Sequence, residues 1–389
     1  MNITPHLAGV AAGALAIGLW AAPARAQAIT PVPGTTTRDI AFTSHDGYPM
    51  LGRLTLPDTP GPHAVLMLVQ TAEAQPKDGQ QRNARGERGP VYTLYRANLA
   101  PLGIGFFSYE GRGVSANAGG GPVIDRPVYD TSTLANKVQD GVSAVRTLQK
   151  QPGVDPSRIV LRGISEGTLL AAEIAVQIPS EVAGLVLSGV IGSTLKDALE
   201  FMASGGVYLQ HLRLWDGDKD GRISLAEFEA AGGPAVLPPG ATFKTLDPDG
   251  DGLYTIADRS VLSAGLVNAI RTDNFDGFLP WLEASAGVAV PRTVRLWMQD
   301  HSTQPTMWDL LQKLSIPVGL FQGETDANTP AAQVRALEQK AKAAGKTNLE
   351  FRYFDGLDHG LGTMVYFNTG KPSAGYAAIF EFMKRYERR

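Results

Sequence analysis

Apolar residues along this chain fall into short continuous runs and into longer runs with a helical repeat. The short runs predict strands at residues 39–43, 51–56, 64–69, 104–109, 159–161, 183–190, 316–322 and 349–354. The longer runs predict helices at residues 91–102, 131–151, 168–177, 330–344 and 376–386. Strands that alternate with helices predict an α/β fold, with a mostly parallel central sheet and helices on both faces.

The alternation of strands and helices stops midway along the chain and resumes later, which predicts an insertion. We expect a core formed by residues 27–190 and 313–389, with a helical cap or lid inserted at residues 191–312. Polar and glycine-rich stretches at 70–89 and 110–122 are expected to be loops of the core.

The charge of the whole chain is nearly balanced, with a formal net charge of −3. Without a basic excess, the composition gives no support to nucleic-acid binding. The insertion differs from the core because it contains sixteen Asp and Glu but only nine Lys and Arg. This local acidic excess suits bound cations.

The first 26 residues have the features of a secretory signal peptide. An apolar run at residues 7–19 precedes Ala-Arg-Ala at 24–26, a small-residue cleavage pattern. The run is short for a membrane anchor, which is the alternative interpretation. The chain has no cysteine, which fits an exported protein that avoids stray oxidation. We expect a secreted or periplasmic protein without stable membrane insertion after signal cleavage.

The insertion contains two twelve-residue segments with the spacing of EF-hand calcium loops, residues 216–227 and 247–258. Each has Asp at its first, third and fifth positions and Gly at its sixth, where the chain must bend. The seventh residue offers a backbone carbonyl, and an acidic residue closes the loop. The expected ligands of the first loop are Asp216, Asp218, Asp220, Arg222 and Glu227. Those of the second loop are Asp247, Asp249, Asp251, Leu253 and Asp258.

Both loops offer the hard oxygen ligands that calcium prefers, about six to eight of them per ion. Asp258 is one methylene shorter than Glu227, so the second loop is expected to be looser or more tolerant of magnesium. Ile223 and Tyr254 are expected to pair between the loops. We expect two Ca²⁺ ions with a structural role, because an exported protein meets no cytosolic calcium pulse.

Gly163-Ile164-Ser165-Glu166-Gly167 matches the G-x-S-x-G pattern of a nucleophile elbow. An apolar run precedes it and a helix-like run follows it, so a strand, a sharp turn and a helix meet at Ser165. Such a turn leaves little room for side chains beside the serine, and Gly163 and Gly167 satisfy that requirement. The alternative, an ordinary glycine turn, does not explain this context. Ser165 is therefore the expected nucleophile.

A serine hydroxyl becomes a strong nucleophile only with a base beside it that an acid orients. In enzymes with this elbow, the acid and then the histidine follow the serine along the chain. Asp326, which follows the first strand after the insertion, is the expected acid, and Glu324 is the alternative. His359 is the one histidine beyond the last predicted strand, so it is the expected base.

These motifs together resemble the serine α/β-hydrolases, in particular exported bacterial esterase-like members whose elbow reads G-H-S-E-G-G. The matching residues are Gly163, Ser165, Glu166, Gly167, Arg112, Gly113, Gly323, Asp326 and His359. Ile164 and Thr168 depart from the family's elbow at positions that perform no chemistry. The resemblance covers residues 38–190 and 313–389. It implies an α/β-hydrolase fold in which the calcium-loop segment takes the place of a cap over the active site.

The expected oxyanion loop departs further from that family. The family reads H-G-x-G after the third strand, whereas this chain reads Gln70-Thr71-Ala72-Glu73-Ala74. An oxyanion hole needs backbone N–H groups, one from the residue after the nucleophile and one from this loop. We expect Glu166 and Ala72 to supply them, with Thr71 as the alternative in the loop.

The sequence therefore predicts an exported serine hydrolase that cleaves a small-molecule carboxylic ester by a Ser–Asp–His acyl-enzyme mechanism. Two alternatives stay open: a secreted serine peptidase or amidase of the same fold, and an inactive calcium-binding interaction protein. The aromatic residues of the insertion form either an apolar lid surface or its core; they are Tyr208, Phe275, Phe278, Trp281, Trp297 and Trp308. The sequence leaves the oligomeric state open.

Overall fold

The computed structural model describes residues 31–71, 75–82, 88–117, 120–235, 237, 241–274, 276–277 and 292–387. Its central sheet contains β1 (Thr35–Thr43), β2 (Pro49–Pro57), β3 (His63–Leu68), β6 (Ile104–Tyr109), β9 (Val154–Ile164), β10 (Gly184–Ser188), β13 (Val318–Gly323) and β14 (Leu349–Phe354). The strands lie in the order β1-β2-β6-β3-β9-β10-β13-β14. From β6 to β14 every neighbouring pair is parallel, whereas β2 is antiparallel to both of its neighbours. The predicted mostly parallel sheet is confirmed.

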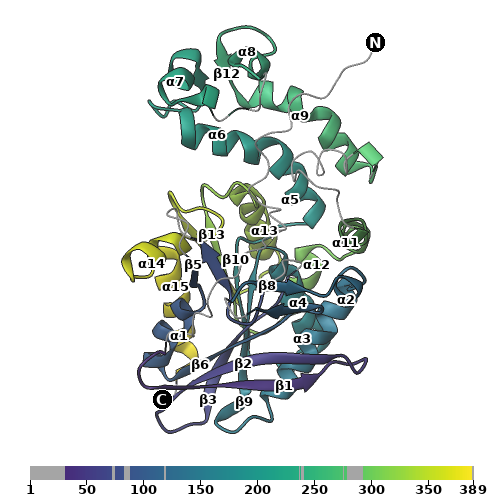
Figure 1. Cartoon of the computed structure of the whole chain (residues 1–389), viewed down its shortest axis with the longest axis vertical. Helices are drawn as coiled ribbons and strands as arrows, with labels where there is room; N and C mark the ends of the chain where they lie inside the picture. Colours follow the sequence, from purple (N-terminus) through teal and green to yellow (C-terminus); the bar gives the residue numbers. More distant parts are fainter. Residues whose placement is uncertain are drawn as a thin grey trace.

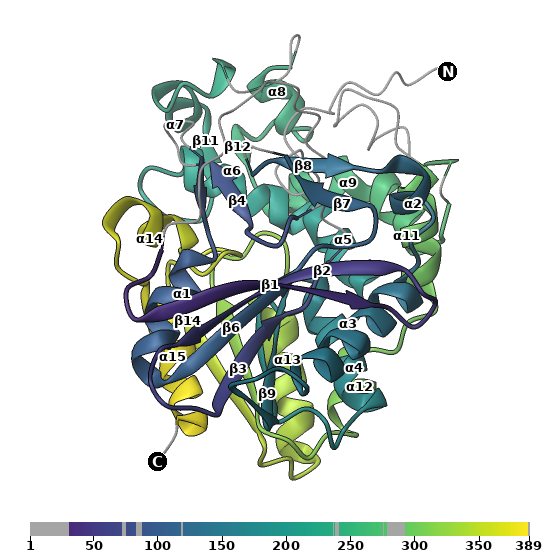
Figure 2. The same cartoon turned by 60° about the horizontal axis from the view of Figure 1, so that its bottom comes forward.

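Helices cover both faces of the sheet, as the strand–helix alternation predicts (Figure 2). One face is covered by α3 (Leu134–Leu148), α4 (Glu166–Gln177), α12 (Met307–Leu311) and α13 (Ala331–Ala343). The other is covered by α1 (Thr93–Leu99) and α15 (Ala374–Met383). Successive side chains of β9 point to opposite faces of the sheet, because side chains alternate along a strand. Leu161 packs with the α3 and α4 side, and Val160 packs with the α1 and α15 side.

Two short ribbons lie in stretches that the sequence suggests are loops. β4 (Gln80–Arg82) pairs with β5 (Arg88–Pro90), and β7 (Val114–Ala116) pairs with β8 (Pro122–Ile124). Each strand has three residues, which is too short to show an alternating apolar pattern. Sequence periodicity therefore misses them.

The chain leaves the sheet after β10 and returns to it at β13. The connecting elements are α5 (Leu195–Phe201), a π-helical turn (Met202–Gly206), α6 (Val207–Trp215), β11 (Ile223–Ser224), α7 (Leu225–Ala230), α8 (Phe243–Leu246), β12 (Leu253–Tyr254), α9 (Ile256–Arg271), α11 (Arg292–Ser302) and α12. Figure 1 shows α6 to α9 grouped apart from the sheet. We call residues 207–271 the helical lobe.

The helical lobe has an apolar core of its own. Its buried members are Tyr208, Trp215, Ile223, Phe228, Leu237, Phe243, Leu246 and Tyr254. β11 and β12 pair in antiparallel fashion with Ile223 opposite Tyr254, as the loop pattern predicts. Tyr208 therefore belongs to the core of the insertion and not to a lid surface, while Phe275, Phe278 and Trp281 lie outside the described residues.

The predicted signal peptide also lies outside the described residues. Among the helices of the described ranges, none combines the length and the apolar character that crossing a bilayer requires.

His211 is buried in the helical lobe between two aromatic side chains. Its ring stacks on that of Trp215 with the centroids 4.4 Å apart, and its Nδ1 lies 3.1 Å from the Tyr254 hydroxyl. Burial, with a smaller contribution from the charge of Arg259, lowers the pKa of His211 to about 4. The folded lobe therefore holds this imidazole in its neutral form above that pH.

We expect the lobe to lose stability as the pH falls from about 6.5 to about 4. In this window the unfolded chain takes up a proton at His211 and the folded lobe does not, so acid favours unfolding. The effect is on the order of 3 kcal/mol and levels off below about pH 4, where both states are charged. Denaturant unfolding at fixed calcium, followed by circular dichroism across this pH range, measures it.

His211→Gln is the control for this pH dependence, because glutamine keeps a polar group beside Tyr254 but does not titrate. The unfolding free energy of the variant should depend less steeply on pH in the same window. Parallel pH profiles for the wild type and the variant would show that other groups cause the loss.

Candidate active site

Ser165 lies at the junction of β9 and α4, in a backbone conformation that non-glycine residues rarely adopt. Its φ is 54° and its ψ is −125°. Its N–H donates to the carbonyl of Ser188 at 3.1 Å, and its own carbonyl accepts from Thr168 N–H at 2.9 Å. A Cβ on Gly163 would clash with the carbonyl of Gly167, so the turn closes only with glycine at 163. This is the local geometry of a nucleophile elbow.

The guanidinium of Arg162 is fully buried beneath the elbow. It donates to the carbonyl of Gly163 at 2.6 Å and to the hydroxyl of Ser188 at 2.6 Å. It also donates to the hydroxyl of Tyr95 at 3.2 Å. Arg162 therefore ties the backbone just before Ser165 to the end of β10. The sequence shows Arg162 only as a polar residue at the end of an apolar run, so its role is missed there.

Asp326 and His359 lie in the loops that follow β13 and β14, and the structure brings them together. His359 Nδ1 is 2.9 Å from Asp326 Oδ2 and 3.1 Å from Oδ1. Asp326 is 1% exposed and also accepts from Thr329 N–H at 2.8 Å and from Gln322 Nε2 at 2.9 Å. Because a carboxylate only accepts, His359 Nδ1 carries the shared proton, and Nε2 is the ring nitrogen that can accept another.

The carboxyl of Asp326 is held in its ionised form. Burial alone would raise its pKa, but the charge of His359 and hydrogen bonds from His359 and Thr329 outweigh it and lower the pKa. Glu324, the alternative acid, pairs with Arg335 on α13 instead. The geometry therefore favours Asp326 as the partner of His359.

Gly189, at the end of β10, lies directly against the ring of His359. A Cβ at this position would come within 2.7 Å of His359 Cε1 and 2.9 Å of Nδ1. The neighbouring carbonyl of Ser188 accepts from Ser165 N–H, so the end of β10 contacts both the serine backbone and the histidine ring. Gly189 has a φ of 53°, a conformation that glycine adopts freely. Sequence reasoning gives no reason to select it among 44 glycines.

The predicted oxyanion donors are only partly described. Glu166 opens α4, so its N–H is one of the helix N-terminal groups that lack a partner within the helix. Ala72 lies outside the described residues. Thr71 is described, and a Cβ on Gly167 would lie 3.2 Å from its Cγ2. The loop after β3 therefore passes beside the N-terminus of α4, where the sequence predicts a second oxyanion donor.

Arg112, one of the residues matched to the esterase-like pattern, is a buried residue that pairs with one buried and one exposed carboxylate. Its guanidinium donates to Asp140 at 2.7 Å and to Asp46 at 2.5 Å. Ser44 also contacts this guanidinium, at 3.1 Å. Arg112 thus anchors the loop after β6 to α3 and to the β1–β2 turn, and its role is structural.

The first acidic loop brings three of its predicted ligands together. Carboxylate oxygens of Asp216, Asp218 and Asp220 lie within 4.8 Å of one another. Glu227 instead accepts hydrogen bonds from Ser224 N–H at 2.9 Å and Gly217 N–H at 3.1 Å. Bonds from the backbone and hydroxyl of Ser224 are the main cause that lowers the pKa of Glu227 to about 2.

The remaining predicted ligand of this loop is a backbone carbonyl, that of Arg222. The guanidinium of Arg222 pairs with Asp220 at 3.1 Å, so the side chain contacts the acidic cluster as well. Gly221 has a φ of 83°, which agrees with the sharp bend expected at this position.

The second acidic loop brings together a different set of carboxylates, those of Asp247, Asp249 and Asp258, again within 4.8 Å. Asp258 is buried and also accepts from Thr255 N–H at 2.8 Å. Asp251, another predicted ligand, accepts from Leu253 N–H at 2.8 Å. Each loop thus presents a cluster of hard oxygen donors that is able to bind a metal ion.

The base of the insertion touches the loop that carries Asp326. A Cβ on Gly206, in the π-helical turn, would clash with the carbonyl of Ala327. Arg213 of α6 donates to the carbonyl of Thr325 at 3.4 Å. Arg259 of α9 donates to the carbonyl of Ala203 in the same π-helical turn. The helical lobe is therefore connected through this turn to the loop that carries Asp326.

Comparison with known proteins identifies the fold. No family model matches this sequence, and none of the curated proteins is similar to it in sequence. A hypothetical protein from Pseudomonas aeruginosa matches with a TM-score of 0.51 at 15% identity, over 92% of this chain and 96% of its own. An esterase from Pyrococcus furiosus matches with a TM-score of 0.51 at 13% identity, over 94% of this chain and 98% of its own. The chain has the α/β-hydrolase fold, and the likeness extends to the fold alone.

Proposed function

We propose that the protein is a serine hydrolase that cleaves carboxylic esters with Ser165, His359 and Asp326. The observation that carries this proposal is the strained φ of 54° at Ser165, combined with the Asp326–His359 pair in loops at the same edge of the sheet. Strained residues of this kind cluster at active sites, where the surrounding structure maintains them.

Acyl transfer begins when the Ser165 hydroxyl attacks the carbonyl carbon of the ester and gives its proton to His359 Nε2. Asp326, bonded to Nδ1, keeps the ring in this orientation and stabilises the cation that forms. The Glu166 N–H and a donor from the loop after β3 stabilise the negative oxygen of the tetrahedral intermediate. The carbon–oxygen bond then breaks, and His359 protonates the departing alcohol.

Water then hydrolyses the acyl-enzyme, and His359 again acts first as a base and then as an acid. His359 takes a proton from water, and the hydroxide attacks the acyl carbon. Ser165 leaves as its oxygen recovers a proton from His359, and a carboxylic acid is released. These reaction steps use only Ser165, His359, Asp326, the oxyanion donors and water.

We propose that the two acidic loops bind calcium. Three carboxylates converge in each loop, and the loops are joined by the β11–β12 ribbon. Asp216, Asp218 and Asp220 would hold one ion, and Asp247, Asp249 and Asp258 the other. Bound calcium would neutralise the clustered charges and fix the helical lobe, which contacts the Asp326 loop through the π-helical turn. Its role would be structural.

We also propose export to the periplasm or the medium. The sequence of residues 1–26 supports this, because an apolar run precedes a small-residue cleavage pattern. Extracellular calcium sites commonly have Kd values of about 10⁻⁴–10⁻³ M, which suits an exported protein.

Ser165→Ala should abolish hydrolysis of short and medium nitrophenyl esters, with a fall in kcat of at least about 10⁴-fold. The wild type should also react with a fluorophosphonate, because only an activated serine is labelled. Ester turnover and probe labelling, measured for both proteins, test the proposal. Unreduced turnover in folded Ser165→Ala would exclude this mechanism, and aminoacyl amides as the preferred substrates would indicate a peptidase.

Gly189→Ala should lower kcat by about 10- to 100-fold, because the new methyl group displaces the His359 ring and small misplacements are costly. Gly345→Ala is the matched control, since Gly345 also has a positive φ but has open space around its Cβ position. Both variants carry backbone strain, and only the first should lose activity. Equal kcat values in the two would mean that His359 tolerates displacement.

Calcium at about 100 times its Kd should stabilise the protein by about 3 kcal/mol for each occupied loop, and EDTA should reverse this. Asp216→Asn and Asp247→Asn should each reduce the calcium-dependent rise in Tm. Thermal unfolding with calcium, magnesium and EDTA measures the effect.

Glu229→Gln is the control for calcium binding, because Glu229 is an exposed acid on α7 outside both carboxylate clusters. It should keep the full calcium response. A Tm that is the same in calcium and in EDTA would rule out the structural role of the ion.

A further inference from the structure

Glu166, the residue after Ser165, has a buried carboxylate that accepts hydrogen bonds from the insertion. It is 5% exposed, and its Oε1 accepts from Trp297 Nε1 at 2.7 Å and from His301 Nε2 at 2.8 Å. Lys137 Nζ of α3 lies 3.9 Å from the same oxygen. Three positively polarised groups therefore converge on one carboxylate beside the candidate nucleophile.

Trp297 and His301 both belong to α11, through which the insertion returns to the core (Figure 1). A third side chain of this helix, Asp300, accepts from Leu134 N–H at the start of α3 at 2.8 Å. α11 thus binds the core through the first turns of both α3 and α4.

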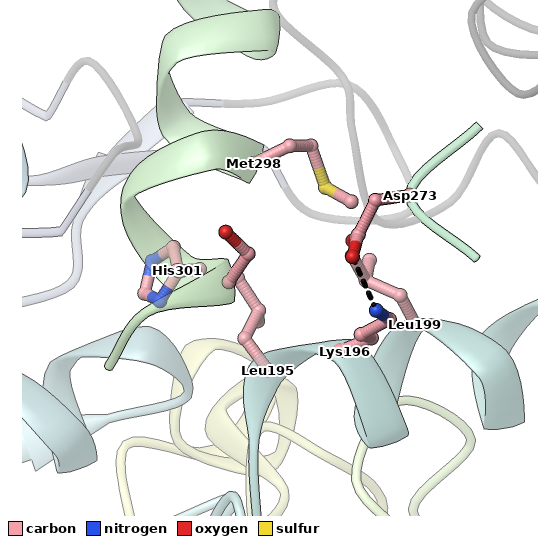
Figure 3. A pocket seen from close by; sticks show the side chains of 7 residues that line it. Leu195, Lys196, Leu199, Asp273, Met298 and His301 are labelled. Atoms are coloured by element: carbon pink, nitrogen blue, oxygen red, sulfur yellow. Dashed lines mark hydrogen bonds and ion pairs between the residues drawn. The ribbon is translucent and has the colours of Figure 1, made fainter. Parts of the chain in front are cut away.

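Met298 and His301 of α11 also face α5, the helix through which the insertion begins. Figure 3 shows Met298 of α11 facing Leu195 and Leu199 of α5. The narrow space between them is open to solvent, and the Lys196–Asp273 ion pair, at 2.8 Å, lies at its edge. α11 therefore lies between the start of the insertion and the elbow.

The charge of Glu166 bears directly on acyl transfer, because its own N–H is the expected oxyanion donor. An unpaired carboxylate close to the developing oxyanion would raise its energy by repulsion between like charges. Burial strengthens this repulsion, since few water molecules screen it. Hydrogen bonds from Trp297 and His301 spread the carboxylate's charge and reduce its effect on the oxyanion.

The same contacts restrain the backbone. The peptide that carries Glu166 N–H follows Ser165, whose φ of 54° persists only while surrounding groups hold it. Packing around Gly163 and the bonds of Arg162 hold the strand side of the turn. The bonds of Glu166 to α11 hold the helix side.

We propose that Trp297 and His301 are positioning residues for the hydrolase reaction. Acting through Glu166, they orient the oxyanion N–H and offset the carboxylate charge beside it. These roles depend on the serine hydrolase activity proposed above. They make the return helix of the insertion a determinant of the oxyanion hole.

His301→Leu should lower kcat by about 10- to 100-fold with less than about a twofold change in KM, because the loss acts on the transition state. His301→Gln, whose side-chain N–H reaches toward the position of Nε2, should recover part of the rate. Trp297→Phe keeps the ring but removes the donor, so it should also lower kcat. Steady-state kinetics on a nitrophenyl ester, with Tm measured for each variant, supplies these values.

The double variant His301→Leu/Glu166→Gln distinguishes positioning from general damage. Glutamine removes the carboxylate charge that is less well compensated once the His301 donor is lost, so kcat should rise at least about fivefold above that of the single variant. Loss of packing alone would not be repaired by a second substitution. If His301→Leu does not fold, Trp297→Phe and its double variant with Glu166→Gln decide the question.

Gln304→Met is the matched control, because Gln304 donates to Glu173 of α4 at 3.1 Å without touching Glu166. It should keep the wild-type kcat. The proposal is overturned if folded His301→Leu has the wild-type kcat, if Gln304→Met loses as much, or if the double variant is no faster. Wild-type turnover that equals that of Ser165→Ala would instead overturn the serine mechanism, and the roles of Trp297 and His301 with it.

Discussion

The rest of the candidate site depends on the strained turn at Ser165. A φ of 54° in a non-glycine residue costs on the order of 1–3 kcal/mol, so neighbouring groups must supply the compensation. Gly163 lets the turn close against the carbonyl of Gly167, and Arg162 binds the carbonyls beneath it. Glu166 continues this support into α4. This one constraint explains why Arg162 is buried beneath the turn.

Local patterns are sufficient to predict the sheet and the two loops that bring Asp326 and His359 together. The serine turn, Asp326 and His359 follow from motif and chain order, because each lies directly after a strand whose apolar run is evident. The short ribbons at β4–β5 and β7–β8 were missed, since three residues show no periodicity. The acidic loops were recognised, yet Glu227 bonds to backbone amides where the pattern predicts a ligand.

The residues that the sequence could not select are those whose roles arise from contacts distant in the chain. Gly189 is special only because His359, far along the sequence, packs on it. Trp297 is one of several aromatic residues of the insertion and His301 belongs to no motif, so only their contact with Glu166 distinguishes them. A single sequence shows the spacing of residues within a helix or strand, but it does not show which helices and strands contact one another. These residues can therefore be identified only from the structure.

The insertion touches the candidate site at two points for a topological reason. It leaves the sheet after β10 and returns before β13, and both crossings occur beside loops that carry the site. The π-helical turn therefore meets the Asp326 loop, and α11 meets Glu166. π-helical turns are rare and are frequently found at functional sites. The insertion thus contacts both the loop of Asp326 and the residue after Ser165, at two points that are far apart in its own sequence.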